Sequence, residues 1–229
     1  AWIGVESNHR DNWIVQSKNI PFLVELLDVA KEVGTEKFIF LGSQAEYGNI
    51  DGKISEEDKT QALNAYGSIK LACLEIVMTF CNTNDINWIW LRLFSLFGER
   101  ENENWLIPSL IQSMVNENQM DFTPGDQKYA YLYVKDFALL MNKLLVMSIQ
   151  SGIYNISSNK TRTIKSLIED IRNSVNPNFV LNFGALKYRN NQSMHMEGDI
   201  LKLSSQIGEI EFTDYTIALQ NTIKYYLKK

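Results

Sequence analysis

The sequence predicts an α/β fold with a doubly wound parallel sheet and a smaller carboxyl-terminal lobe. Two apolar runs, at residues 37–43 and 86–98, are typical of strands that are buried on both faces. Segments with helical periodicity separate these runs, so the first hundred residues alternate strand, helix, strand, helix and strand. This order is typical of a parallel sheet whose strands are connected by helices. With 45% apolar residues in a chain of 229, the composition is sufficient for a packed core.

The first hundred residues supply the predicted sheet. The strand-like run AWIGV (1–5) is followed by a polar stretch and by a helix from about Ser17 to Val33. The buried face of this helix is expected to carry the apolar residues spaced three and four apart, Ile20, Leu23, Val24, Leu27 and Ala30. The strand at 37–43, a polar loop, a helix from about Ala65 to Phe80 and the strand at 86–98 complete this part.

The sequence changes in character from Glu99 onward. The expected order is a helix beginning at Pro108, a turn at 122–127, a strand and helix over 129–145, a short strand at 151–158, an amphipathic helix capped by Thr163, and a final helix over 216–229. We therefore divide the chain into a unit of residues 1–98 and a lobe of residues 99–229, with about 130–158 returning to the main sheet.

Charge and cysteine usage disfavour several classes of function. The 22 basic residues are outnumbered by 27 acidic ones and form no basic cluster, so neither a nucleic acid nor an anionic membrane is expected as a partner. No apolar run reaches the roughly 20 residues of a membrane span. Cys73 and Cys81 lie about 12 Å apart along one predicted helix, too far for a disulfide, so free thiols in a reducing cytoplasm are expected. The two histidines, His9 and His195, are far apart in sequence, and no metal site is predicted.

Tyr66 and Lys70 are four residues apart on a predicted helix, so their side chains share one face. Two further pairs have this spacing, Tyr131/Lys135 and Tyr225/Lys229. The first of them lies in a segment that alternates like a strand, and the second lies at the chain end. Only Tyr66 opens a helix shortly after a strand that ends in a hydroxyl, Ser43. Because ligands bind beyond the carboxyl ends of such strands, this pair is the candidate for a site.

Five stretches resemble the extended short-chain dehydrogenase/reductases, in particular their nucleotide-sugar epimerases, dehydratases and reductases. They occur in that family's order, as GSQAEYG (42–48), AYGSIK (65–70), LRLFSLFG (91–98), YLYVKDFA (131–138) and GIYNISS (152–158). The resemblance implies that residues 1–98 are the carboxyl-terminal part of a Rossmann-type cofactor domain and that residues 99–229 bind substrate. The family's glycine-rich G-x-x-G-x-x-G turn is not found in the sequence. Three strand–helix units before AWIGV require roughly 75 residues, so we expect that the chain lacks its amino-terminal portion.

The resemblance implies that Ser43, Tyr66 and Lys70 form a catalytic trio. Tyr66 then exchanges a proton with a sugar oxygen while the nicotinamide transfers hydride, and Ser43 hydrogen-bonds the same oxygen. A phenol with a pKa near 10 requires roughly 4 kcal/mol to act as a base near pH 7. One positive charge at about 4 Å supplies about that much at an effective dielectric constant near 20. We therefore expect the Lys70 ammonium to lower the pKa of Tyr66 and to bind the nicotinamide ribose.

The remaining binding residues also follow from the resemblance. The expected cofactor, NAD or NADP, contacts Tyr66, Lys70, Phe94, Ser95 and Leu96. The expected substrate-binding residues are Ser43, Gln44, Ser95, Trp105, Ile107 and Arg189. For Trp105 and Ile107, packing in the core is an equal alternative.

Several positions narrow the chemistry or are expected to be structural. Gln44 and Ala45 stand where the dehydratases of this family carry an acid pair, and Glu46 points to the opposite side if the segment is extended, so 4,6-dehydration is disfavoured. Tyr129-Ala130 replaces an Arg-Asp pair of many relatives, so nucleotide or phosphate recognition there must differ. Asn19 is expected to bond the backbone rather than relay a proton, and Asp136 to tie a strand to a helix.

Two classes of function therefore stay open. The first is an NAD(P)-dependent enzyme that oxidises or reduces a ring carbon, expected to be carbon 4, of a nucleotide-linked sugar, as an epimerase or as a one-way ketoreductase or dehydrogenase. The second is a non-catalytic NAD(P)-binding module of the same fold. The resemblance also implies a homodimer in which the helices of Asn19 and Tyr66 pair with their copies.

Overall fold

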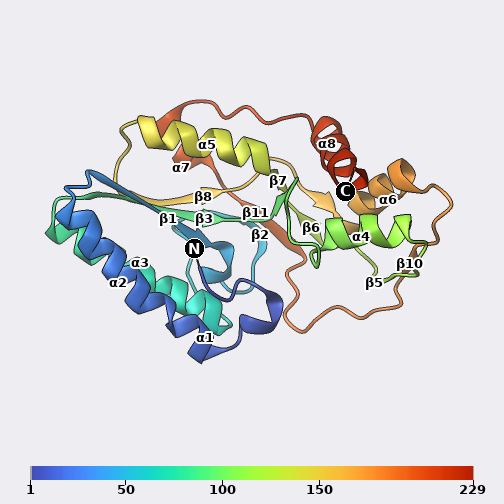
Figure 1. The fold of residues 1–229 in the computed structure, drawn as a ribbon, viewed down its shortest axis with the longest axis horizontal. Coiled ribbons are helices and arrows are strands. Elements are labelled where there is room, and N and C mark those ends of the chain that lie inside the picture. Colours follow the sequence, from blue (N-terminus) through green and yellow to red (C-terminus); the bar gives the residue numbers. More distant parts are fainter. Residues whose placement is uncertain (1, 229) are drawn as a thin grey trace.

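A parallel three-stranded sheet forms the centre of the computed structural model, which describes residues 2–228. Its strands are β1 (Lys37–Ser43), β3 (Asn87–Leu93) and β8 (Gly152–Ile156), in the order β1-β3-β8. The register pairs Ser43 with Leu93 and Leu93 with Ile156, so the three carboxyl ends lie at one edge of the sheet (Figure 1). The prediction of an α/β fold with a parallel sheet is confirmed.

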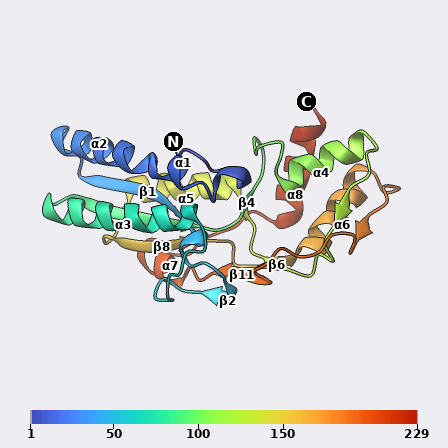
Figure 2. The same cartoon turned by 90° about the horizontal axis from the view of Figure 1, so that it is seen from below.

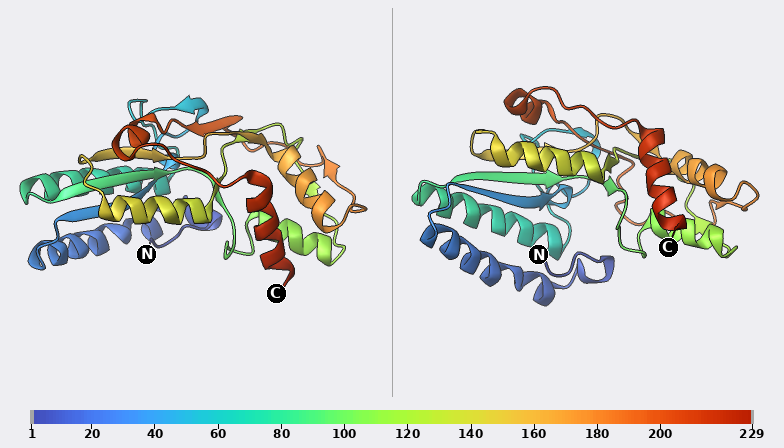
Figure 3. Two further views of the ribbon diagram at one scale, coloured as in Figure 1. Left: turned by 90° about the horizontal axis from the view of Figure 1, so that it is seen from above. Right: turned by 45° about the horizontal axis from the view of Figure 1, so that its top comes forward.

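Helices cover both faces of this sheet (Figures 1 and 3). One face carries α1 (Trp13–Ser17), α2 (Asn19–Glu32) and α3 (Ala65–Thr83), and the other carries α5 (Val134–Val146) and α7 (Leu201–Ile207). Apolar side chains of α2 and α3 pack with β1 and β3 in one core cluster, and those of α5 and α7 pack with β3 and β8 in another. The sheet is therefore buried on both faces, as its continuous apolar strands predict.

The second lobe lies beside the main sheet (Figure 2) and has a hydrophobic core of its own. Helices α4 (Leu106–Val115), α6 (Ile164–Val175) and α8 (Tyr215–Leu227) pack together around it. The short strands β5 (Asp121–Phe122) and β10 (Asn182–Phe183) pair in parallel at its side. The Thr163 hydroxyl accepts a hydrogen bond from the Ser166 N–H at 3.0 Å, which confirms the predicted amino-terminal cap of α6.

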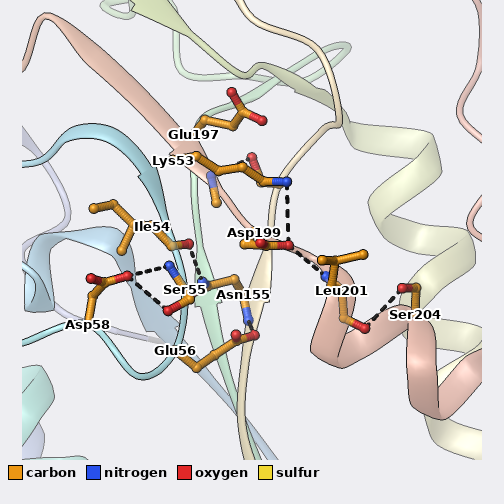
Figure 4. Close-up of polar contacts among 12 residues, drawn as sticks. Lys53, Ile54, Ser55, Glu56, Asp58, Asn155, Glu197, Asp199, Leu201 and Ser204 are labelled. Carbon is orange, nitrogen blue, oxygen red and sulfur yellow. Dashed lines mark hydrogen bonds and ion pairs between the residues drawn. The ribbon is translucent and has the colours of Figure 1, made fainter.

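Short strands connect the two parts of the molecule. A four-stranded sheet has the order β2-β11-β6-β9, formed by β2 (Asp51–Ile54), β11 (His195–Gly198), β6 (Lys128–Tyr129) and β9 (Arg162–Thr163). A second link pairs β4 (Leu96–Phe97) with β7 (Leu132–Tyr133). The buried Asn155 of β8 joins β2 to the main sheet, because its Nδ2 donates to the Ile54 carbonyl at 2.9 Å and its N–H donates to the Glu56 carboxylate at 2.7 Å (Figure 4).

Several element boundaries differ from the prediction. The strand expected over 86–98 is divided into β3 and β4. The helix expected from about Ser17 to Val33 corresponds to α2, and the short helix α1, which was not expected, precedes it. Pro108 is the third residue of α4, a position at which its missing N–H costs no hydrogen bond. The polar last third contains β11 and α7, which the sequence analysis missed because both are short. Lys135 lies in the first turn of α5, and Lys229 of the third Tyr/Lys pair lies outside the described residues.

The beginning of the chain also differs from the prediction, because residues 2–5 form no strand. Instead, the Ile3 N–H donates to Asn19 Oδ1 at 2.8 Å, and Asn19 Nδ2 donates to the Ile3 carbonyl at 3.1 Å. Asn19 thus bonds the backbone as expected. Asp136 ties α5 to the segment before α8 rather than to a strand, because its carboxylate accepts hydrogen bonds from the Thr213 N–H and hydroxyl. Within residues 2–228, no helix is both long and apolar enough to cross a membrane.

Candidate active site

A cavity of about 610 Å³ lies at the carboxyl edge of the central sheet, where the second lobe meets it. Except for Lys70, every residue that the sequence assigned to the site lines this cavity, namely Ser43, Gln44, Tyr66, Phe94, Ser95, Leu96, Trp105, Ile107 and Arg189. The register of β1 and β3 explains this, because Ser43 and Leu93 are direct neighbours at the ends of their strands. The cavity is the candidate active site.

Ser43 occupies a turn that begins where β1 ends. It caps the 3₁₀ helix η2 (Gln44–Glu46), with its hydroxyl accepting from the Ala45 N–H at 3.2 Å and donating to Gln44 Oε1 at 2.8 Å. Glu46 Oε1 accepts from the Ser43 N–H at 2.8 Å and closes the capping box. The expectation of an extended segment is therefore wrong. Because the chain turns here, Glu46 reaches back beneath Ser43.

Glu46 forms a fully buried ion pair with Arg92 of β3. Its Oε2 accepts from Arg92 Nε at 2.8 Å, and the Trp90 indole N–H donates to both carboxylate oxygens. Burial raises the pKa of Glu46, and the Arg92 guanidinium acts against this rise. Burial lowers the pKa of Arg92, but Glu46 and Tyr47 together raise it by more, so the guanidinium stays charged.

The same network continues to β8 and anchors the Ser43 turn. The Arg92 guanidinium lies 4.4 Å from the centre of the Tyr47 ring, and the Tyr47 hydroxyl donates to Asn155 Oδ1 at 2.8 Å. Asn155 is itself fixed to β2, as Figure 4 shows. Ser43 is consequently held by contacts that reach all three strands of the central sheet.

Tyr66 is placed next to Ser43 by the start of α3. Asn64 caps the helix, since its Oδ1 accepts from the Gly67 N–H at 2.9 Å. A β-carbon on Gly67 would lie 2.4 Å from the Ala45 carbonyl oxygen, so only glycine permits this turn of α3 to pack so closely on η2. The Tyr66 N–H donates to the Arg10 carbonyl at 2.8 Å, which fixes the other side of the helix start.

Lys70 takes a direction that the spacing did not predict. Its ammonium is buried, donates to the Leu41 carbonyl at 2.7 Å, and lies 3.5 Å from the centre of the Trp2 ring. It lies 5.7 Å from the centre of the Tyr66 ring. Burial lowers the pKa of Lys70 to about 7, because desolvation disfavours the charged form.

The ionisation of Tyr66 therefore differs from the expectation. Burial raises the pKa of the phenol, whereas hydrogen bonding with the Ser43 side chain and the charge of Arg10 lower it, and the charge of Glu46 raises it. The expectation that the Lys70 ammonium lowers this pKa is not met. The spacing of four residues places Tyr66 and Lys70 on the same face of α3. The long lysine side chain, however, points to the backbone carbonyl of Leu41 on β1.

The cavity also contains charged and aromatic residues that the sequence analysis missed. Arg10, Glu101, Tyr129 and Tyr131 line it. Glu101 Oε2 is buried without a hydrogen-bond partner among the described residues, and burial raises the pKa of this carboxyl to about 7. Arg10 and Glu101 lie in loops, where no periodic signal indicates which way a side chain points, and Tyr129 lies in β6, a strand of only two residues.

Ile107 and Trp105, for which core packing was an equal alternative to substrate binding, differ in their exposure. Ile107 is 2% exposed and belongs to the core of the second lobe, although it also borders the cavity. Trp105 is 38% exposed at the cavity wall, and its ring lies 5.5 Å from the Arg10 guanidinium. Arg189 is exposed at the same cavity. Core packing therefore explains much of Ile107, whereas Trp105 is available to a ligand.

A nicotinamide cofactor, which the resemblance implies, can be tested against this geometry. An ammonium has three N–H donors, and of the described residues only Leu41 supplies Lys70 with a hydrogen-bond acceptor. Two N–H donors of the ammonium are therefore unused, and the Trp2 ring lies over them at 3.5 Å. Tyr66 and the 94–96 segment border the same space. The residues present fit the nicotinamide end, and none is assigned to the pyrophosphate.

Comparison with known proteins agrees with this architecture. The family model of the NAD dependent epimerase/dehydratase family matches residues 2–157. The Low-salt glycan biosynthesis protein Agl12 of Haloferax volcanii is 28% identical over 144 residues, covering 62% of this chain and 46% of that protein. The uncharacterized UDP-glucose epimerase YtcB of Bacillus subtilis is 25% identical over 158 residues, covering 67% and 50%. The chain thus spans about half the length of these relatives.

Solved structures show the same fold. The UDP-glucuronic acid 4-epimerase from Bacillus cereus in complex with NAD superposes with a TM-score of 0.85 at 21% identity, covering 95% of this chain and 70% of that one. At this identity the likeness establishes the fold alone. The family model, by contrast, covers more than half of the chain. The chain belongs to the NAD dependent epimerase/dehydratase family.

Proposed function

We propose that this protein oxidises or reduces a ring carbon, at carbon 4, of a nucleotide-linked sugar with the help of NAD or NADP. One observation carries the proposal. The Ser43 hydroxyl, the Tyr66 phenol and the 94–96 segment line a single cavity at the carboxyl edge of a parallel sheet, where ligands bind in folds of this kind. The relatives named for UDP-glucose and UDP-glucuronic acid support the substrate class.

In this proposal Tyr66 and Ser43 are the catalytic residues at the sugar. The phenol exchanges a proton with the reacting sugar hydroxyl, and the Ser43 hydroxyl hydrogen-bonds the same oxygen and holds it in line. A bound nicotinamide cofactor supplies or accepts the hydride at the ring carbon. When such a cofactor is bound, the side chain of Lys70 would hold its ribose and the segment Phe94–Leu96 would hold its nicotinamide end.

The other residues of the cavity are proposed to bind the substrate. Gln44 accepts a hydrogen bond from the Ser43 hydroxyl, and Ser95, Trp105 and Ile107 line the same cavity. Arg189 carries a positive charge at the same cavity, which suits the diphosphate of a nucleotide-linked sugar. Gln44 and Ala45 supply no acid for the elimination of water, so an epimerase, a ketoreductase or a dehydrogenase is favoured over a dehydratase.

Substitution of Tyr66 by phenylalanine tests the proposal. Tyr66→Phe removes the proton-transferring group and is expected to lower turnover of UDP-glucose, UDP-glucuronic acid or related sugar nucleotides by roughly 100-fold or more. Tyr188→Phe is the matched control, because it removes a phenolic hydroxyl that bonds Asp126 instead. Unchanged turnover in Tyr66→Phe would contradict the catalytic role of Tyr66, whereas an unsubstituted protein that turns over none of these sugar nucleotides would favour a non-catalytic NAD(P)-binding module.

The nucleotide released from denatured protein separates the remaining alternatives. Tightly held NAD is expected of an epimerase, which returns the hydride to the substrate, whereas loosely held NADPH is expected of a one-way reductase. Product analysis completes the distinction, because only an epimerase interconverts two sugars without net consumption of cofactor. A 4-keto-6-deoxy product detected by mass spectrometry would instead indicate a dehydratase.

We also propose a homodimer that is formed through the exposed side of α2. Phe22, Leu26, Val29 and Val33 are exposed and follow one another at spacings of four, three and four residues, so they form one apolar stripe. A second copy of this chain would cover it in the packing of helix against helix. Val29→Glu is expected to yield a monomer in sedimentation experiments at micromolar concentration, and a monomeric unsubstituted protein would contradict the dimer.

A further inference from the structure

Arg10 contacts the candidate catalytic phenol from a loop that no sequence motif identifies. The centre of its guanidinium lies 5.0 Å from the centre of the Tyr66 ring, which is closer than the Lys70 ammonium at 5.7 Å. Its carbonyl accepts the Tyr66 N–H at 2.8 Å, and its Nε donates to the Val5 carbonyl at 3.1 Å. Arg10 is therefore held by its own loop and touches Tyr66 through both backbone and side chain.

The same guanidinium also contacts the second lobe. It lies 5.5 Å from the centre of the ring of Trp105, which immediately precedes α4. Arg10 borders the candidate active site together with Ser43 and Gln44. The Arg10 side chain thus contacts both the phenol on α3 and the lobe that is proposed to bind substrate, and it borders the cavity between them.

The charged and polar groups around Tyr66 come from three elements. Lys70 lies on α3 itself but donates to the Leu41 carbonyl. Ser43 and Glu46 approach from the turn after β1, where the negative charge of Glu46 opposes ionisation of the phenol. The loop before α1 contributes Arg10 and the edge of the Trp2 ring, which lies 6.0 Å from the Tyr66 ring. Of these groups, Arg10 is the cation that faces both the phenol and the cavity.

We propose that Arg10 is a positioning residue of the active site, which holds the Tyr66 ring against Ser43 and stabilises its phenolate while Trp105 keeps the guanidinium in place. This inference rests on the proposed function. It assigns to Arg10 the stabilisation of the Tyr66 phenolate that the sequence analysis expected of Lys70. An arginine suits this position because its planar guanidinium stacks on aromatic rings and stays charged at every working pH. The direction of the electrostatic effect agrees, since the charge of Arg10 lowers the pKa of Tyr66.

The pH dependence of kcat/KM tests the proposal. Removing one facing charge with Arg10→Gln is expected to raise the pKa that governs the Tyr66 base by about one unit. The rate near pH 7 then falls about tenfold, and the deficit disappears as the pH rises above that pKa. Arg10→Lys restores the charge and part of the rate. Arg162→Gln is the matched control, because Arg162 also stacks on a tyrosine, Tyr215, at 3.3 Å, but outside this cavity.

A second measurement needs neither substrate nor activity. The ultraviolet absorbance of tyrosinate is titrated in the unsubstituted protein and in Arg10→Gln, each compared with the same protein carrying Tyr66→Phe, so that the difference reports Tyr66 alone. The titration of Tyr66 is expected to move to higher pH in Arg10→Gln. Arg10→Met, which retains an apolar stem between the two rings, replaces Arg10→Gln if the latter does not fold.

The outcomes are distinct. An unchanged Tyr66 titration in Arg10→Gln, or an equal change in Arg162→Gln, overturns the proposal. If the unsubstituted protein turns over no nucleotide-linked sugar, the proposed function fails, and the absorbance titration alone decides whether Arg10 tunes the phenol. A shifted titration together with a pH-dependent loss of rate supports both.

Discussion

Two buried cations lie at the carboxyl edge of the same sheet, and they differ in what they bond. Arg92 is 2% exposed and donates to the Glu46 carboxylate at 2.8 Å. Lys70 is 3% exposed and donates to a neutral carbonyl, that of Leu41, at 2.7 Å. The pKa of Arg92 is raised by its carboxylate, whereas that of Lys70 is lowered by burial to about 7. The carboxylate of Glu46 thus offsets the desolvation of Arg92, whereas the hydrogen bond to a carbonyl does not offset that of Lys70.

This difference separates a structural role from a functional one. The carboxylate of Glu46 pairs with the charge of Arg92 and makes the pair a fixed support for the Ser43 turn. Lys70 has unused N–H donors and a pKa at which it can lose its proton, so a ligand with hydroxyl or anionic oxygens would change its ionisation. Of the two cations, Lys70 is the one that can respond to a bound molecule.

The largest expected effect comes from breaking the buried pair. Glu46→Gln retains the shape of the side chain but leaves Arg92 as an uncompensated charge, which resembles the situation of Lys70. Loss of one partner of a buried ion pair costs about 4 kcal/mol, so the free energy of unfolding is expected to fall by about that amount. Urea denaturation followed by circular dichroism measures the change.

An exposed ion pair provides the control for this substitution. Lys135 donates to Glu99 at 2.7 Å but its side chain is 61% exposed. Lys135→Gln is expected to lower the free energy of unfolding by less than about 1 kcal/mol, because water replaces the lost partner. If Glu46→Gln costs no more than this control, the pair does not support the Ser43 turn in the way described.

The contrast between the two cations also shows what the sequence could predict. The sheet and the positions of Ser43 and Tyr66 follow from buried apolar strands and from the rule that sites form at their carboxyl ends. The direction of the Lys70 side chain could not be predicted, because several rotamers of a long side chain are compatible with the same position on a helix. Glu46 was misplaced because a capped turn, not an extended strand, follows Ser43.

The loops limited the prediction of the site most strongly. Arg10 and Glu101 line the cavity because the chain folds back over the sheet edge, and no periodicity in their segments indicates this. Trp105 lines the cavity, but its contact with Arg10 joins residues that are 95 positions apart in sequence, from 105 − 10. Such contacts depend on tertiary packing and are not encoded in a local pattern.

The lowered pKa of Lys70 is expected to make the stability of the protein depend on pH. The pKa of this lysine is about 7 in the folded protein against 10.5 for an ordinary lysine, so between these values the unfolded chain binds more protons. Stability that arises from Lys70 therefore increases with pH across this window, by about 2 kcal/mol between about pH 7 and about pH 9. Lys70→Met is expected to abolish this increase in denaturation experiments at the two pH values.

Lys37 offers a matched control for that measurement. It is also a lysine that donates to backbone carbonyls, those of Leu144, Leu145 and Met147, but it lies at the opposite end of β1. Lys37→Met should leave the increase of stability with pH in place. If Lys70→Met retains the full increase, burial does not shift the lysine and the comparison with Arg92 loses its basis.

The smallest expected effect concerns Glu101 of the candidate active site, whose pKa is shifted by burial as that of Lys70 is. Its carboxyl lacks a partner for Oε2 among the described residues, and burial raises its pKa to about 7 from 4.5. Because the folded protein holds this proton more tightly than the unfolded chain, the contribution of Glu101 to stability is present below about pH 4.5 and is lost as the pH rises through about 7.

Glu101→Gln replaces the titrating carboxyl by a neutral amide of the same size. The variant is expected to be about 1 kcal/mol more stable than the unsubstituted protein near pH 8 and equally stable near pH 4, with partial solvent access reducing the effect. Glu57→Gln, at a side chain that is 90% exposed, should show no such dependence. A carboxyl that pairs with Arg10 or Arg189 in solution would give the opposite sign, a variant that is less stable near pH 8, because the ionised form would then be the favoured one. A variant that is more stable near pH 8 thus indicates that Glu101 is an unpaired acid, just as Lys70 is a buried base without a carboxylate partner. A variant that is less stable indicates that Glu101 is paired with a cation, as Glu46 is paired with Arg92.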